Sequence, residues 1–155
     1  MQKSLRILLA EDESIILMGL KSNIKKLGHQ VIGQAFDGVE AVKLALEKEP
    51  DLLIIDINMP KMDGIEAIKK INEQKLIPAI VVTGYNDEKL INRASKAGAF
   101  AYLIKPVDKN DIKPAINIAQ NRFKEYKNLL SELDDSKKAL EARKIIERAK
   151  GIVMD

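Results

Sequence analysis

Five short apolar runs, each followed by a longer segment of helical period, constrain the fold of this chain more than any other feature. The runs cover residues 5–10, 31–36, 52–56, 79–83 and 100–104. Three of them are apolar almost throughout, which is typical of strands that are covered by helices on both faces of a parallel sheet. A strand–helix unit repeated five times predicts an α/β fold built on a doubly wound, five-stranded parallel sheet.

Residues that favour helix ends stand between the runs. Gly28 and Gly98 follow two of the expected helices, at positions where glycine adopts a left-handed conformation most easily. Asp37 and Asp108 precede two others and can accept hydrogen bonds from the exposed N–H groups of a first turn. The single histidine, His29, follows Gly28, and we expect it to lie in a surface loop.

Composition excludes several classes of protein. The 155 residues include 26 basic and 23 acidic side chains, and this formal charge of +3 is too small to identify a nucleic-acid-binding protein. The chain has no cysteine, which excludes disulfides, thiolate zinc sites and thiol nucleophiles. No apolar run approaches the roughly 20 residues that span a bilayer, and the chain opens with Met1-Gln2-Lys3 instead of a signal peptide. We therefore expect a cytoplasmic protein with no membrane contact of its own.

Polar side chains stand where four of the five runs end. Glu11 and Asp12 follow the first run, Asp56 closes the third, Thr83 closes the fourth and Lys105 follows the fifth. The carboxyl ends of parallel strands meet at one edge of a sheet, so these groups should converge. Three carboxylates repel one another unless a cation neutralises them, and an oxygen-only ligand set suits magnesium. A carboxylate beside a metal, an ammonium and a hydroxyl can attack phosphorus, which predicts phosphoryl transfer to Asp56.

At these positions the sequence resembles the receiver domain of two-component response regulators. The matching segments are LRILLAEDE, DLLIIDINMPKMDG, VVTGY and AYLIKP, and the resemblance covers about residues 4–120. It implies the flavodoxin-like receiver fold, with Asp56 as the phosphoacceptor and a sensor histidine kinase as the partner that supplies the phosphoryl group. It also implies a Mg²⁺ site. The implied metal ligands are Glu11, Asp12, Asp56 and the backbone carbonyl of Asn58.

The resemblance assigns further roles around the phosphoacceptor. Thr83 and Lys105 match the residues that bind the phosphoryl group, and Tyr102 matches a switch aromatic that turns inward when the hydroxyl of Thr83 moves toward that group. Pro106 matches a proline preceded by a cis peptide bond, which aims the lysine. Glu11 stands where the family more often has Asp, so its carboxylate takes a different place around the metal. Such a protein is a signalling protein and not an enzyme, since it catalyses only its own phosphorylation and dephosphorylation.

Beyond Pro114 the helical pattern continues without a break as far as Gly151. Starting just before this proline, apolar or small residues recur at alternating steps of four and three, at Ile112, Ile116, Ala119, Phe123, Tyr126, Leu130 and Leu133. This heptad seam predicts a long C-terminal coiled-coil helix that pairs two copies in a parallel homodimer, which phosphorylation favours. Lys137 continues the seam as a polar position, and the phase breaks after Leu140.

The last residues resemble the opening of the ANTAR domain, an RNA-binding antitermination module. Members of that family typically begin with an Ile-Glu-Arg-Ala-Lys-Gly run, which is present at residues 146–151. The module is a three-helix bundle, so the resemblance implies a truncated chain with an incomplete domain. The candidate contacts to RNA phosphates are Arg143, Lys144, Arg148 and Lys150, which fit a solvated helix surface equally well. The predicted organisation is a receiver at 1–120, a coiled-coil linker at 121–140 and the start of an ANTAR domain at 141–155.

Several functions share parts of this pattern. The leading hypothesis is a response regulator that accepts a phosphoryl group on Asp56 and, in the intact protein, controls transcription antitermination by binding RNA hairpins. The alternative is a receiver whose coiled-coil dimer is its own output, or a phosphorelay intermediate, with no nucleic-acid role. A flavodoxin-like cofactor binder would share the fold, but Glu11-Asp12-Glu13 is acidic where a flavin phosphate requires an anion nest. An enzyme acting on a diffusible phosphoester is a further possibility, although the sequence offers no substrate pocket beyond the strand ends.

Overall fold

The structure is a computed structural model that describes the backbone of residues 3–84 and 86–149 and the side chains as far as residue 134. The chain divides into two compact units, Met1–Gln120 and Asn121–Asp155. Each unit is described by itself below.

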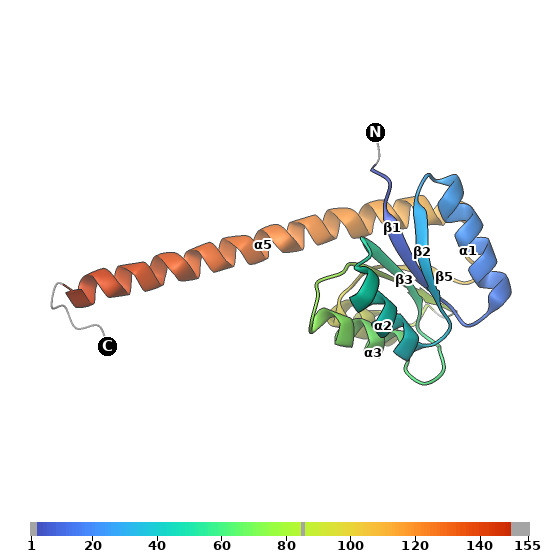
Figure 1. Ribbon diagram of the computed structural model, residues 1–155, viewed down its shortest axis with the longest axis horizontal. Coiled ribbons are helices and arrows are strands. Elements are labelled where there is room, and N and C mark those ends of the chain that lie inside the picture. The colour runs from blue at the N-terminus through green and yellow to red at the C-terminus, as the bar shows by residue number, and fades with distance from the viewer. Residues whose placement is uncertain (1–2, 85, 150–155) are drawn as a thin grey trace. The chain divides into compact units, whose positions relative to one another are not determined.

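Five parallel strands form one sheet in the order β2-β1-β3-β4-β5, and Figure 1 shows β2, β1 and β3 side by side. The strands are β1 (Arg6–Ala10), β2 (Gln30–Ala35), β3 (Leu52–Asp56), β4 (Ala79–Thr83) and β5 (Ala99–Ile104). Each predicted run coincides with one of these strands, and the observed ends differ from the predicted ones by at most one residue. The order changes direction between β1 and β3, which is the topological switch point of a doubly wound sheet. The predicted fold class is confirmed.

Helices cover both faces of the sheet (Figure 1). One face carries α1 (Ser14–Lys26) and the beginning of α5 (Lys109–Ala149), and the other carries α2 (Gly38–Lys48), α3 (Gly64–Asn72) and α4 (Glu88–Ala97). Successive residues of a strand point to opposite faces. In β3, Leu53 packs on the α2–α3 side and Ile54 on the α1–α5 side, and both are buried. Because each strand needs apolar side chains on both faces, its sequence is a continuous apolar run and not an alternating one.

The helix ends follow the predicted signals. Asp37 caps α2, because its Oδ1 accepts a hydrogen bond of 2.8 Å from the backbone N–H of Glu40. Asp108 Oδ1 likewise accepts a bond of 2.8 Å from the N–H of Asn110 at the start of α5. Gly28 and Gly98 have φ values of 92° and 122°, in the region where a side chain is strained.

The helix α5 runs from Lys109 to Ala149, so the predicted long C-terminal helix is confirmed. Its heptad seam, however, has two parts with different surroundings. Ile112, Ile116 and Ala119 are buried in the core beneath the sheet, whereas Leu130 and Leu133 are 42% and 55% exposed. The first three seam positions therefore belong to the core of the Met1–Gln120 unit. The side chains of Lys137 and Leu140 lie outside the described residues. Among the described helices, none carries the long uncharged apolar stretch that a bilayer crossing needs.

His29 is buried, so the prediction of a surface loop was wrong. His29 is only 7% exposed, and its Nδ1 accepts a hydrogen bond of 3.0 Å from the backbone N–H of Leu5. The N–H of Gln30 donates in turn to the carbonyl of Leu5 at 2.8 Å, which joins β2 to the chain just before β1. The ring thus satisfies a donor that lies 24 residues earlier in the sequence, and local sequence carries no signal of such a contact.

We expect acid to weaken the fold through His29. Burial lowers the pKa of His29 below its ordinary value of 6.5, so the neutral ring contributes its full stability above about pH 6.5, and this stability is lost as the pH falls through the folded pKa. Asn offers an acceptor at a similar position and does not titrate. Between about pH 7.5 and about pH 5, the wild type should therefore lose about 1 kcal/mol of unfolding free energy relative to His29→Asn. Denaturant unfolding measures this, and a pH-independent difference would contradict it.

Candidate functional site

The carboxyl ends of three strands bring an ammonium and three carboxylates together. Glu11 and Asp12 follow β1, Asp56 ends β3 and Lys105 follows β5. The Nζ atom of Lys105 lies 2.8 Å from Asp56 Oδ2 and 2.9 Å from Glu11 Oε1. One carboxylate oxygen from each of Glu11, Asp12 and Asp56 lies within 4.8 Å of the others. The structure thus collects these predicted residues at one edge of the sheet.

The two innermost carboxyl groups of this cluster differ from ordinary surface acids. Glu11 and Asp56 are 1% and 3% exposed. Burial and the neighbouring carboxyl of Asp56 raise the pKa of Glu11 to about 8, although Lys105 opposes this shift. Burial also disfavours the charged form of Lys105, but the ion pairs with Asp56 and Glu11 outweigh it and raise the Lys105 pKa to about 12.

Glu11 lacks the hydrogen bonds that a buried carboxylate normally has. Within the described residues, neither of its oxygens accepts a well-directed hydrogen bond, although Oε1 makes the ion pair with Lys105. Buried polar atoms are nearly always paired, since leaving them unpaired costs free energy. An additional cation beside Glu11, Asp12 and Asp56 would satisfy these oxygens. The donor set is made of oxygen atoms alone, which fits magnesium.

The loop after Asp56 is shaped by two close backbone approaches. The N–H of Gly64 donates to the carbonyl of Ile57 at 2.8 Å, and a Cβ atom at Gly64 would overlap the carbonyl of Asp56. A Cβ atom at Gly38, in the first turn of α2, would overlap the backbone of Met62. The loop therefore folds back tightly, and the N–H of Asn58 donates to Asp56 Oδ1 at 3.2 Å.

An open pocket of about 400 Å³ gives access to Asp56. It is lined by Asp12, Glu13, Asp56, Asn58, Gly84 and Lys105. Sequence reasoning missed Glu13 and Gly84 as parts of this site. Glu13 Oε1 lies 3.8 Å from Lys105 Nζ, and its side chain is 64% exposed. Its place directly after the acidic pair at a strand end was the available signal, because such a position faces the same edge of the sheet.

The two predicted switch residues, Thr83 and Tyr102, do not line this pocket. Thr83 is fully buried at the end of β4, and its carbonyl accepts a hydrogen bond of 2.8 Å from the N–H of Lys105. The next residue, Gly84, lines the pocket, whereas Thr83 does not belong to its lining. Tyr102 lies on β5 and is 46% exposed. The peptide bond between Lys105 and Pro106 is cis.

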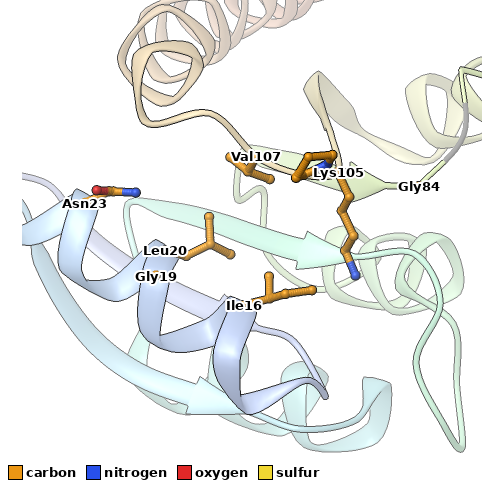
Figure 2. Close-up of a pocket in the computed structure, with 8 residues that line it drawn as sticks. Ile16, Gly19, Leu20, Asn23, Gly84, Lys105 and Val107 are labelled. Atoms are coloured by element: carbon orange, nitrogen blue, oxygen red, sulfur yellow. The ribbon is translucent and has the colours of Figure 1, made fainter.

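A second pocket, of about 540 Å³, lies between α1 and the loop after β5 (Figure 2). Its lining is Ile16, Gly19, Leu20, Asn23, Gly84, Lys105, Pro106 and Val107. Lys105 and Gly84 line both pockets, so the apolar pocket adjoins the acidic one. The same helix carries Ile15 and Met18, which are 86% and 69% exposed. An apolar surface thus borders the carboxylate cluster.

Comparison with known proteins agrees with this fold. The response regulator receiver domain family matches residues 7–117. The chain belongs to this family. One relative, the transcriptional regulatory protein PdtaR of Mycobacterium tuberculosis, is 43% identical over 148 residues, which cover 96% of this chain and 72% of that protein. The match to the family ends at residue 117, so the resemblance of residues 141–155 to an ANTAR domain stays a prediction. The side chains of Arg143, Lys144, Arg148 and Lys150 lie outside the described residues.

Solved receiver structures are similar to this one. The response regulator domain of Thermotoga maritima CheB superposes with a TM-score of 0.72 at 30% identity, over 77% of this chain and 98% of that domain. The complex of CheX with CheY, BeF3 and Mg²⁺ from Borrelia burgdorferi gives a TM-score of 0.69 at 28% identity, over 72% of this chain and 85% of the matched chain. The receiver fold and its family are therefore established for this chain.

The receiver should lose stability as the pH rises when no divalent cation is present. The raised pKa of Glu11 means that the folded state holds a proton on this carboxyl between its ordinary pKa of 4.5 and a pH of about 8. This contribution to stability is therefore complete below about pH 4.5 and disappears as the pH passes about 8. In EDTA, the unfolding free energy should fall by at least about 1 kcal/mol across this range. Glu11→Gln should remove most of the fall in denaturant titrations. An equal fall in the variant would show that other groups cause it.

Proposed function

We propose that this receiver accepts a phosphoryl group on Asp56 from a sensor histidine kinase. The proposal rests on the surroundings of Asp56. This carboxylate is buried at the end of β3, contacts the ammonium of Lys105 at 2.8 Å and lines a pocket of about 400 Å³. A carboxylate held in this way is a nucleophile for phosphorus, with a cation already in place for the charge of the transferred group.

Each neighbour of Asp56 has a part in that reaction. Lys105 shifts from its two carboxylate partners toward the phosphoryl oxygens and offsets their charge in the transition state. The N–H of Asn58 holds Asp56 Oδ1 and so orients the carboxylate. The hydroxyl of Thr83 moves to the new phosphoryl group, and Tyr102 turns inward from its exposed position to fill the space.

The proposal includes a magnesium ion at the carboxylate cluster. Asp12 and Asp56 would hold it, together with the backbone carbonyl of Asn58, and Glu11 would stand beside it. When bound, magnesium neutralises carboxylate repulsion and supports the charge of the phosphoryl oxygens. The solved CheY complex from Borrelia burgdorferi, which contains Mg²⁺ and BeF3, supports this assignment. Because ligand binding to the folded state stabilises it, millimolar magnesium should raise the melting temperature of the wild type.

The apolar pocket beside Lys105 is where we expect the kinase to dock. The apolar side chains of Ile16 and Leu20 line this pocket, and the exposed Ile15 lies on the same helix, α1. Apolar side chains of a partner helix can fill such a groove and place a phosphohistidine over the adjoining acidic pocket. Because Lys105 lines both pockets, a kinase docked in the apolar pocket would lie next to the site of phosphoryl transfer.

Phosphorylation should require Asp56 itself. We expect a small acyl phosphate with magnesium to add one phosphoryl group to the wild type, and Asp56→Asn to abolish the addition, because an amide is neither anionic nor sufficiently nucleophilic. Asp63→Asn is the matched control. Asp63 caps α3 by accepting from the N–H of Glu66, and Asn caps helices equally well. Intact-mass and peptide mass spectrometry measure the adduct, and undiminished labelling of Asp56→Asn would exclude Asp56 as the acceptor.

For the output, we propose a phosphorylation-favoured parallel homodimer through α5 and, in the intact protein, antitermination by binding RNA hairpins through an ANTAR domain. Tyr126, Leu130 and Leu133 are 41%, 42% and 55% exposed along one heptad seam, and a second copy would cover them. The relative PdtaR is named as a transcriptional regulatory protein and is similar over nearly the whole chain, which supports a role in gene expression. The alternative output is the dimer alone, with no nucleic acid.

The seam predicts the oligomeric state. Leu130→Asp places a charge inside the proposed interface and should shift phosphorylated protein from dimer to monomer in sedimentation at matched concentration. Asn128→Asp adds the same charge at an exposed position off the seam and should leave the dimer intact. An unchanged dimer with Leu130→Asp would place the interface elsewhere. Salt-sensitive binding of hairpin RNA by the wild type, weakened by Arg148→Glu, would favour the RNA output over the dimer alone.

A further inference from the structure

We propose that Glu13 determines which phosphodonors this receiver accepts, by repelling small anionic donors at the mouth of the pocket. The inference rests on the proposed role of Asp56 as phosphoacceptor. It assigns to an exposed side chain the task of favouring a protein donor over small acyl phosphates.

Glu13 stands at the entrance of the pocket and not in its interior. Its side chain is 64% exposed, whereas those of Glu11 and Asp56 are 1% and 3% exposed. It lines the same pocket as Asp12 and Asp56, but it lies outside the group of three carboxylates that can hold a cation. Its charge is therefore available to act on a molecule that approaches Asp56 from solvent.

Glu13 is not needed to hold Lys105. The ammonium already has two buried carboxylate partners at 2.8 Å and 2.9 Å, and Glu13 is the most distant of the three at 3.8 Å. The side chain of Glu13 also makes no capping hydrogen bond to α1. Its carbonyl accepts from the N–H of Leu17 at 3.0 Å, and any residue can provide that contact. A change of this side chain can thus alter the charge of the entrance without rebuilding the site.

The charge balance makes an additional carboxylate unfavourable for anionic donors. Lys105 and a bound magnesium ion would offset the carboxyl groups of Glu11, Asp12 and Asp56, whereas Glu13 lies outside the group that can hold the cation and adds its negative charge at the entrance. Like charges reduce the rate at which a charged molecule enters such a cleft, and salt screens the effect between exposed groups. A donor that carries two negative charges should be repelled more strongly by Glu13 than a donor with one.

A protein donor has a source of binding energy that small donors lack. The apolar pocket lined by Ile16 and Leu20 adjoins the acidic one, and contacts there can offset repulsion of the phosphoryl group by Glu13. A small acyl phosphate carries no apolar side chains with which to fill that pocket. Glu13 therefore shifts the balance of donors toward the one that docks on α1, which is specificity obtained by repelling the wrong donor.

The test compares two small donors that differ in charge. Acetyl phosphate is mainly a dianion and phosphoramidate mainly a monoanion near neutral pH. In each reaction a bond forms between an Asp56 carboxylate oxygen and phosphorus. With acetyl phosphate the P–O bond breaks and acetate leaves with the electron pair, and with phosphoramidate the P–N bond breaks and the protonated nitrogen leaves as ammonia.

We expect Glu13→Gln to raise the second-order rate constant for acetyl phosphate by about threefold to fivefold at low salt. The increase should be smaller for phosphoramidate, should appear in KM more than in kcat, and should vanish at high salt. Glu66→Gln is the matched control, because Glu66 is an exposed carboxylate in the first turn of another helix and does not line the pocket. It should change neither rate.

Other outcomes overturn the proposal. A slower reaction of Glu13→Gln, or equal acceleration with both donors at every salt concentration, would mean that Glu13 positions Lys105 and does not select donors. If the wild type takes up no phosphoryl group at all, the proposed function fails separately, and beryllofluoride with magnesium then tests Glu13 by equilibrium binding. Tighter binding to Glu13→Gln, seen as a larger rise in melting temperature, supports the electrostatic role, and an unchanged rise overturns it.

Discussion

The ion pairs of Lys105 are the interaction on which this site depends. One ammonium from the loop after β5 lies within 2.9 Å of carboxylates that come from β1 and β3. Removing a partner from a buried charge cluster is costly, since the remaining charge has neither water nor a counterion. The hydrogen bond from the N–H of Lys105 to the carbonyl of Thr83 fixes the start of that loop on β4. Lys105, which follows β5, therefore joins the ends of β1, β3 and β4.

The strands and the carboxylate cluster could be predicted because they follow from general constraints. Leu53 and Ile54 had to be apolar for a sheet covered on both faces, and parallel strands had to bring Glu11 and Asp56 to one edge. What the sequence could not reveal are contacts between distant segments. His29 meets a donor 24 residues away, and Gly38 makes room for the backbone of Met62 in another loop. Both residues looked like ordinary turn positions in the sequence.

The heptad seam shows a different limit of sequence patterns. The steps of four and three continue unchanged from Ile116 through Leu130, yet Ile116 is 3% exposed in the sheet core and Leu130 is 42% exposed. A helix that packs on a sheet and a helix that pairs with another helix both need an apolar stripe, so periodicity alone cannot separate them. The point where the stripe leaves the core depends on where the sheet ends. That is a property of the tertiary structure.

The residues of the carboxylate cluster differ in how far they can change without loss of the site. Glu11 and Asp56 are nearly inaccessible and both contact Lys105, so a change at Asp56 disturbs the pKa values of Glu11 and Lys105 and the packing of the site. Such residues offer little room to tune a rate without loss of the site. Glu13 is 3.8 Å from the same ammonium but largely in water, and its charge acts on the pocket at small structural cost. Selection for donor choice can therefore act at the entrance of the pocket while the interior remains constrained by chemistry.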